Sequence, residues 1–293
     1  MMDYKALNCL KAVIQFQSFE KAAQHLHLTQ SAVSQSIKKL ELKFASPVLI
    51  RARPVVATPL GERLLAHINK VALLEDDLTD TWQQASQSQP INLAVSNDVL
   101  ATWFPQVVTE FAQQDSVKLH IQAIDQGLTR ELLKTGEVIA CLSDIGTPVS
   151  GGTSTFVGNM VYELVATPAF IHQYLKNDIC PQNILKVPSL IYDQNDELWS
   201  RYQNECLHVT VNNDNSHWYP SSHGFVELVL GGTVCALVPR VQVQKELKRG
   251  ELVSLFPQQT ISVPVYWHWY ELNSAVLHRL SKVILNVTTN VLY

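Results

Sequence analysis

The chain has 293 residues, of which 46% are hydrophobic, and a formal net charge of −4, as expected for a globular protein of two or three domains. No run of about 18 apolar residues occurs, and the N-terminal residues lack the features of a secretory signal, so we expect neither a membrane span nor export. Five scattered cysteines without a CxxC pair argue against a disulfide framework or a metal site and favour reduced thiols in a cytoplasmic protein.

Charge is distributed unevenly along the chain. Residues 1–63 contain nine Lys and Arg but four Asp and Glu, whereas the remainder contains 13 basic and 22 acidic side chains. A basic segment on an acidic body predicts that the N-terminal part meets a polyanion.

The basic segment has the apolar period of three short helices. Ser18 and Thr29 are suited to cap the second and the third. The predicted buried faces are Leu7, Leu10, Val13 and Ile14; Phe19, Ala22, Ala23 and Leu26; and Val33, Ile37 and Leu40.

The other side of the third helix carries a polar stripe, which we call the reading stripe: Ser31, Ser34, Gln35 and Lys38. Hydroxyl and amide groups can reach base edges in a major groove, while Lys reaches phosphates. Two helices joined by a tight turn, with such a face on the second, predict a helix-turn-helix. The alternative is the solvated face of a small bundle, but that face would favour longer charged residues.

Two short strands, residues 48–50 and 54–56, are predicted next and form a wing around Arg51 and Arg53. Those arginines are candidates for phosphate or minor-groove contacts, the alternative being ordinary surface charge.

A long helix is predicted from Thr58 and ends in a polar hinge at residues 83–90. Its apolar stripe has nearly the spacing of a coiled-coil seam, which predicts dimerisation, with packing on its own chain as the alternative. The residues of the stripe are Leu64, Ile68, Val71, Leu74, Leu78 and Trp82.

From residue 91 onward, predicted strands alternate with helices. The pattern includes a helix over 98–114 interrupted near Pro105, a strand over 207–211 (LHVTV) and a final helix over 274–290. Such alternation predicts an α/β body with a largely parallel sheet, large enough for two subdomains with a cleft between them.

The run AAQHLHLTQSAVSQSIKKLE followed by FASPVLIRARPVVATPLG resembles the LysR-type transcriptional regulators, and the resemblance covers the whole chain. The segments LAVSNDVLATWFP and KVPSLIYDQND are similar to the subgroup that controls export of basic amino acids, the ArgP/LysG type. The fold implied is an α+β winged helix-turn-helix domain (1–59), a linker dimerisation helix with a hinge (60–89) and an α/β two-lobed, periplasmic-binding-protein-like effector domain. Its first lobe would comprise 90–162 with 267–293, and its second lobe 163–266.

The resemblance also implies partners and DNA contacts. The chain would act as a homodimer or homotetramer on double-stranded promoter DNA in the nucleoid, with RNA polymerase as a candidate partner and no cofactor. The implied contacts are Gln30, Ser31, Ser34, Gln35 and Lys38 in the major groove, with Arg51 and Arg53 on the wing.

Two departures from the family pattern stand out. The turn before the wing usually carries Gly, but here it reads Phe44-Ala45-Ser46-Pro47, and Ala would strain a left-handed backbone, which predicts a rearranged turn. Residues 124–128 are less acidic than in the basic-amino-acid regulators, which weakens the inference to a basic effector.

The implied effector, lysine, arginine or a related amino acid, needs carboxylates for its cations and hydroxyl or amide donors for its carboxylate. Polar residues at predicted strand ends and helix starts could supply both, although a single Asp there is more often a helix cap. The candidates are Ser96, Asn97, Asp98, Asp125, Ser143, Asp144, Asp193, Ser221 and Ser222, with Trp267, His268 and Trp269 interpreted as packing residues.

Nothing in the chain indicates an enzyme. It contains no GxSxG, Walker, HExxH or strand-linked GxGxxG motif, so we predict no catalytic residues. The competing function is an architectural protein that binds A·T-rich or curved DNA without an effector.

Overall fold

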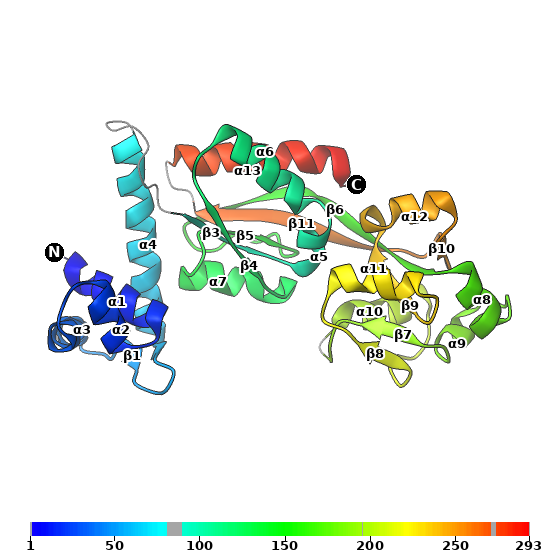
Figure 1. Cartoon of the computed structure of the whole chain (residues 1–293), viewed down its shortest axis with the longest axis horizontal. Helices are drawn as coiled ribbons and strands as arrows, with labels where there is room; N and C mark the ends of the chain where they lie inside the picture. The colour runs from blue at the N-terminus through cyan, green and yellow to red at the C-terminus, as the bar shows by residue number, and fades with distance from the viewer. Residues whose placement is uncertain (1, 81–89, 195, 271–273, 293) are drawn as a thin grey trace.

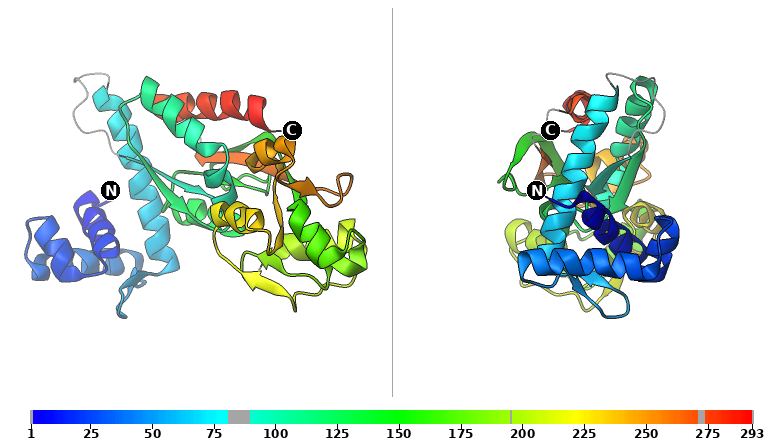
Figure 2. Two further views of the ribbon diagram at one scale, coloured as in Figure 1. Left: turned by 45° about the vertical axis from the view of Figure 1, so that its right-hand side comes forward. Right: turned by 90° about the vertical axis from the view of Figure 1, so that its left-hand side faces the viewer.

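A computed structural model describes residues 2–80, 90–194, 196–270 and 274–292. It consists of an N-terminal domain, a long linker helix and a two-lobed body (Figure 1). Figure 1 and the left view of Figure 2 both show the linker helix, α4 (Pro59–Asp80), between the N-terminal domain and the nearer lobe of the body.

The N-terminal domain contains α1 (Tyr4–Phe16), α2 (Phe19–His25) and α3 (Gln30–Phe44). The predicted caps are confirmed, since Ser18 accepts a hydrogen bond from the backbone N–H of Lys21 and Thr29 accepts one from that of Ala32. A two-stranded wing follows, β1 (Leu49–Ile50) and β2 (Val56–Ala57), paired antiparallel.

The turn after α3 has a left-handed backbone, although the sequence predicted that Ala45 would rearrange it. Ala45 itself adopts the left-handed conformation, with φ 50° and ψ 31°, and the backbone N–H of Ser46 closes the helix on the carbonyl of Glu41 at 3.2 Å. The prediction of a rearranged turn is therefore wrong, and the chain tolerates the strain of a Cβ at this position.

The first part of α4 packs on its own chain. Leu64 and Ile68 are each 5% exposed and lie in the core that α1 and α3 build, so they are reassigned from a dimer seam to that core. Val71 is half-buried, the side chains of Leu74 and Leu78 lie outside what the structure describes, and so does Trp82.

The body contains one nine-stranded sheet, in the order β4-β3-β5-β11-β6-β9-β7-β8, with β10 paired to β6. Parallel pairs lie at its two ends, whereas β11 pairs antiparallel with both β5 and β6, so the sheet is mixed rather than largely parallel. The strands are β3 (Ile91–Val95), β4 (Leu119–Ala123), β5 (Ala140–Ser143), β6 (Gly152–Ala166), β7 (Ser189–Ile191), β8 (Ser216–Trp218), β9 (Cys235–Pro239), β10 (Val253–Ser254) and β11 (Ile261–Tyr270).

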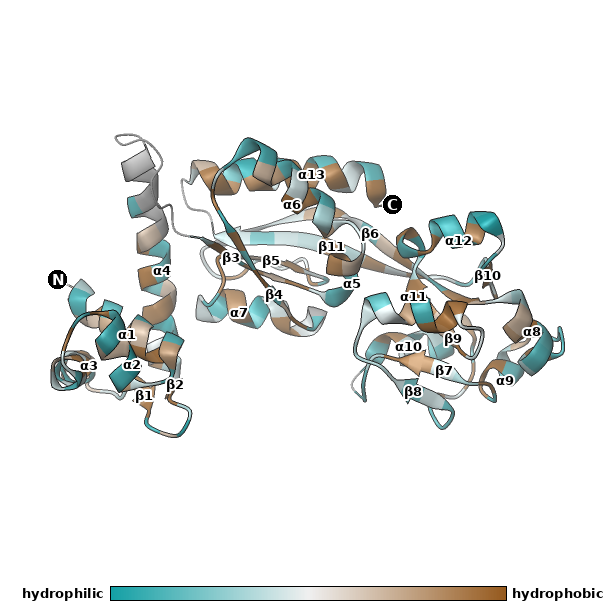
Figure 3. Cartoon of the chain, viewed as in Figure 1, coloured by the Kyte–Doolittle hydropathy of each residue, from teal (hydrophilic) through white to brown (hydrophobic). Residues whose placement is uncertain are grey.

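The long strands β6 and β11 run through both halves of the body, and the lobe limits drawn from the sequence, 162/163 and 266/267, fall inside them. We call the half with β3–β5 lobe I and the half with β7–β9 lobe II (Figure 1). In Figure 3 strand β3 is largely hydrophobic and the outer helix α12 largely hydrophilic, as expected for a sheet buried beneath helices.

Helices cover both lobes. In lobe I, α6 and α13 pack on one face of the sheet and α7 on the other. Lobe I has α5 (Asn97–Ala101), α6 (Phe104–Gln114), a 3₁₀ turn η1 (Gln126–Leu128), α7 (Thr129–Thr135) and α13 (Ala275–Val291). Lobe II has α8 (Pro168–Leu175), α9 (Pro181–Ile184), α10 (Glu197–Arg201), a π-helical turn (Tyr202–Cys206), α11 (Ser222–Leu230), a 3₁₀ turn (Arg240–Gln242) and α12 (Gln244–Arg249).

Two local predictions have opposite outcomes. The interruption near Pro105 is confirmed, because α5 ends at Ala101 and α6 starts at Phe104. The predicted strand LHVTV is wrong: the backbone N–H groups of Leu207 and Val209 donate to the carbonyls of Tyr202 and Gln203 at 3.1 and 3.0 Å, which ties this segment to the preceding helical turn. The strand forms later, at β8.

Candidate DNA-reading surface and effector pocket

The reading stripe lies on the open side of α3. Ser31, Gln35 and Lys38 are exposed and Ser34 is half-buried, while Val33, Ile37 and Leu40 face the core. Gln30, at the first position of the helix, is exposed as well. The hydroxyl of Ser31 is 3.0 Å from that of the capping Thr29, so the start of the stripe is held by the helix cap.

The two wing arginines differ in their surroundings. The guanidinium of Arg51 lies 3.5 Å from the carboxylate of Glu41 and 5.9 Å from the ring centre of Phe19, although its side chain is still 61% exposed. Arg53 is exposed at the tip of the wing. Both can reach a phosphate, but Arg51 would exchange an existing ion pair for it.

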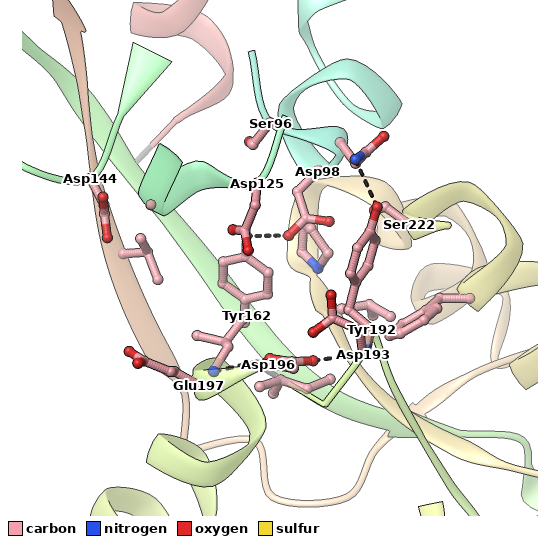
Figure 4. A pocket seen from close by; sticks show the side chains of 18 of the residues that line it. Ser96, Asp98, Asp125, Asp144, Tyr162, Tyr192, Asp193, Asp196, Glu197 and Ser222 are labelled. Carbon is pink, nitrogen blue, oxygen red and sulfur yellow. Dashed lines mark hydrogen bonds between the residues drawn. The ribbon is translucent and has the colours of Figure 1, made fainter. Parts of the chain in front are cut away.

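A cavity of about 520 Å³ lies where lobe I and lobe II meet, and we call it the pocket (Figure 4). That volume is in the range of small-molecule sites. It is lined by Ser96, Asn97, Asp98, Asp125, Gly127, Leu128, Asp144, Tyr162, Tyr192, Asp193, Asp196, Glu197, Leu198, Arg201, Ser222, Phe225, Leu237, Val238, Pro239 and Val263.

Most of the effector candidates from the sequence meet here: Ser96, Asn97, Asp98, Asp125, Asp144, Asp193 and Ser222. The structure does not place the other two, Ser143 and Ser221, on the pocket wall. Ser143 is 1% exposed and accepts the backbone N–H of Ile145, and Ser221 caps α11 by accepting that of Gly224. Both hydroxyls accept backbone N–H groups, so the assignment of Ser143 and Ser221 to effector binding is wrong.

Asp98 is a half-buried carboxylate of the pocket wall. The hydroxyl of Tyr162 donates to it at 2.6 Å. Burial raises the pKa of Asp98 above its usual range, and the nearby Asp196 and Asp125 raise it further, whereas hydrogen bonds from Ser222 and Tyr162 oppose this. Burial and the neighbouring Asp98 in turn raise the pKa of Tyr162 well above its usual value.

Hydrogen bonds already join the lobes across the pocket. The amide of Asn97 in lobe I donates to the hydroxyl of Tyr192 in lobe II at 2.8 Å (Figure 4). Ser222 of lobe II also forms a hydrogen bond with Asp98 of lobe I. Both pairs involve the start of α5, so this turn joins the lobes at the pocket in addition to the continuous strands β6 and β11.

The pocket wall includes residues that sequence reasoning missed. Tyr162 lies within β6 and Tyr192 directly follows β7, in segments that looked like plain core in the sequence, although Tyr192 immediately precedes Asp193, which was a candidate. Asp196 acts as a helix cap, accepting the backbone N–H groups of Tyr192 and Leu198. Glu197 and Arg201 lie on the helix that Asp196 caps, and only the fold brings that helix to the pocket.

The pocket wall is strongly acidic. It contains the carboxylates of Asp98, Asp125, Asp144, Asp193, Asp196 and Glu197 against the single guanidinium of Arg201. That guanidinium is itself 3.4 Å from the carboxylate of Glu205. The hydroxyl of Ser96 is buried and has no hydrogen-bond partner among the described residues, which makes it a candidate donor to a ligand. Such a wall favours an organic cation; over the described residues no His, Cys, Asp and Glu group suited to a metal occurs.

The interpretation of the crossing strand is confirmed: Trp267 and His268 are fully buried, and the indole of Trp267 donates to Ser281 at 2.9 Å. Across the ranges that the structure describes, no helix is long and apolar enough to cross a membrane.

Comparison with known families gives two matches that together span most of the chain. Residues 4–62 match "Bacterial regulatory helix-turn-helix protein, lysR family", and residues 84–286 match "LysR substrate binding domain".

Individual relatives match over nearly the whole length. The HTH-type transcriptional regulator ArgP of Pseudomonas aeruginosa is 39% identical, over 97% of this chain and 95% of its own. The crystal structure of ArgP from Mycobacterium tuberculosis superposes with a TM-score of 0.90 at 28% identity, covering 100% of this chain and 99% of that one. Full-length LysG from Corynebacterium glutamicum with bound effector Arg has a TM-score of 0.78 at 28% identity, and 99% of each chain is covered.

Proposed function

The chain belongs to the bacterial lysR family of helix-turn-helix regulators and is a DNA-binding transcriptional regulator with an effector-binding domain, not an enzyme; from this premise we propose that its effector is a basic amino acid, arginine or lysine. The observation that carries the proposal is the between-lobe pocket with six carboxylates and one guanidinium. The similarity to LysG with bound effector Arg supports it.

Each end of such a ligand finds suitable groups. The two cations of arginine or lysine match carboxylates of the pocket wall such as Asp98 and Asp125. The hydroxyl of Ser96 and the second N–H of the Asn97 amide offer donors for the carboxylate, and α11 begins at Ser222 on the pocket wall. The acids that the segment 124–128 lacks are replaced by Asp144, Asp193 and Glu197 from other segments.

We propose that the N-terminal domain uses the reading stripe with Gln30 in the major groove, and Arg51 and Arg53 on the wing. In this proposal the protein binds a promoter site as a homodimer or homotetramer in the cytoplasm, with RNA polymerase as a partner. Pairing would involve the exposed surface of α4 rather than Leu64 and Ile68, which the domain core already uses.

Calorimetry on the full-length protein tests the effector. L-Arginine or L-lysine should bind, and each should bind about 30-fold or more tightly than its uncharged counterpart, L-citrulline or L-norleucine, because a buried carboxylate loses its cationic partner in the exchange. Agmatine, which lacks the carboxylate of arginine, separates the contribution of the carboxylate and its donors, Ser96 and Asn97, from that of the acids.

The opposite result has a definite meaning. If neither basic amino acid binds while the protein retains a preferred DNA site, the effector proposal is wrong and the architectural alternative, binding of A·T-rich or curved DNA without an effector, gains support.

A further inference from the structure

The linker helix is docked on lobe I through one close backbone contact. Gly136 ends α7 with φ 76° and ψ 16°, and a Cβ added to it would lie 2.0 Å from the Cα of Ala66 in α4. Only a residue without a side chain allows the two helices this approach. Ala66 is 6% exposed, so the contact is closed to solvent.

Two side chains of α4 hold the same contact. The amide of Asn69 donates to the carbonyl of Gly136 at 2.7 Å. The ammonium of Lys70 lies 3.5 Å from the ring centre of Tyr270, whose hydroxyl donates to the carbonyl of Leu133 in α7 at 2.5 Å. Linker helix, α7 and the last residue of β11 are therefore joined at one point.

The other end of α7 begins at the pocket. The helix starts at Thr129, directly after Gly127 and Leu128, which line the pocket. The guanidinium of Arg130 donates at 2.7 Å to the carbonyl of Thr147, in the loop that begins at the pocket residue Asp144. Two pocket segments of lobe I are thus attached to the start of α7, about 10 Å from its end.

We infer that α7 is the element that couples the pocket to the DNA-binding domain: it shifts with the pocket segments when the effector binds, and its contact at Gly136 moves α4. This inference rests on the proposed function, since it requires a ligand in the pocket. A short helix packed against a sheet moves as a rigid body. Because Gly136 and Ala66 are packed backbone to backbone, with no flexible side chain between them, a displacement of α7 displaces α4 as well.

Hydrogen exchange of the full-length protein with and without saturating L-arginine tests the inference, with calorimetry confirming that the ligand binds. L-Arginine should slow amide exchange about fivefold or more in residues 125–135 and, through the contact, in residues 66–72 of α4. Gly136→Ala should retain the first effect and lose the second, because the new Cβ displaces Ala66.

The chain offers a matched control for that variant. Gly250 ends α12 with φ 70° and ψ 14°, and among the described residues nothing lies within 4 Å of a Cβ added there. Gly250→Ala therefore imposes the same backbone strain without a clash, and its exchange response should equal that of the wild type.

Asn69→Leu removes the hydrogen bond to Gly136 without straining α7 and covers the case that Gly136→Ala fails to fold. It should bind L-arginine with unchanged affinity and show a smaller response in α4, because Ala66 stays against Gly136 but the hydrogen bond is lost. A response in α4 that is undiminished in Asn69→Leu, or one that is absent from the wild type although L-arginine binds, overturns the coupling role alone. No binding of L-arginine or L-lysine to the wild type overturns the proposed function, and the inference with it.

Discussion

The predicted DNA-contact residues lie within residues 30–53, on one helix and one wing, whereas the pocket wall draws on segments spread from Ser96 to Val263. The first surface is exposed and basic, and the second is enclosed and acidic. Helical spacing alone brings the reading stripe together, while the pocket exists only because two lobes close on each other. Changes in one region should therefore leave the binding function of the other intact.

The largest expected effect is in the pocket. Asp98→Asn should weaken L-arginine binding by about 30-fold or more, because one of the enclosed carboxylates that faces the cation is lost. Calorimetry measures this, and DNA affinity without effector should stay unchanged. Asp214→Asn, which removes an exposed charge in lobe II, is the matched control. Equal losses of L-arginine affinity in both variants would mean that the net negative charge of the body, rather than the position of Asp98, determines the affinity.

Substitutions in the reading stripe should have the next largest effect, on DNA alone. Gln35→Ala should cost about 1–3 kcal/mol at the preferred site and little on random DNA. Lys38→Ala should weaken all DNA similarly and lower the slope of log affinity against log salt by about 0.9. Anisotropy titrations at several salt concentrations distinguish the two, and a uniform, sequence-blind loss for both would refute the division of roles. L-Arginine binding should not change in either variant.

Ala45→Gly should stabilise the N-terminal domain by about 1 kcal/mol, because glycine adopts the left-handed conformation of this turn without strain. Denaturant unfolding measures the change. Ala32→Gly, in the first turn of α3, provides the contrast and should destabilise the domain, because glycine is a poorer helix former than alanine. Destabilisation by Ala45→Gly would show that the Cβ makes a favourable contact that outweighs the strain.

The smallest effect concerns the body and its pH dependence. Burial lowers the pKa of His268 below its usual value of 6.5. As pH falls below 6.5 the unfolded chain takes up the proton first, so stability is present above that pH and is lost below it. His268→Gln should flatten the decline between pH 7.5 and 5.5 by less than about 1.4 kcal/mol per pH unit. His217→Gln, at an exposed position, is the control. If the urea unfolding midpoints of the wild type and of His268→Gln fall equally with decreasing pH, His268 is not the cause of the decline.

The structure of the N-terminal domain could be predicted from the sequence almost completely. The caps Ser18 and Thr29, the buried faces of the three helices and the polar stripe all follow from contacts between residues a few positions apart, which spacing records directly. The interruption near Pro105 and the last helix were predictable for the same reason. Ala45 is the exception: alanine disfavours the left-handed backbone, but the hydrogen bonds of the turn hold it in that conformation.

The core packing of α4 and the assembly of the pocket could not be predicted from the sequence. Spacing showed an apolar stripe on α4 but could not tell whether Leu64 and Ile68 face a second chain or their own domain. It suggested acids at strand ends, but only the crossing of β6 and β11 between the lobes brings Tyr162 and Glu197 to the same pocket. Those positions depend on contacts between residues far apart in the chain, and a local pattern carries no information about such contacts.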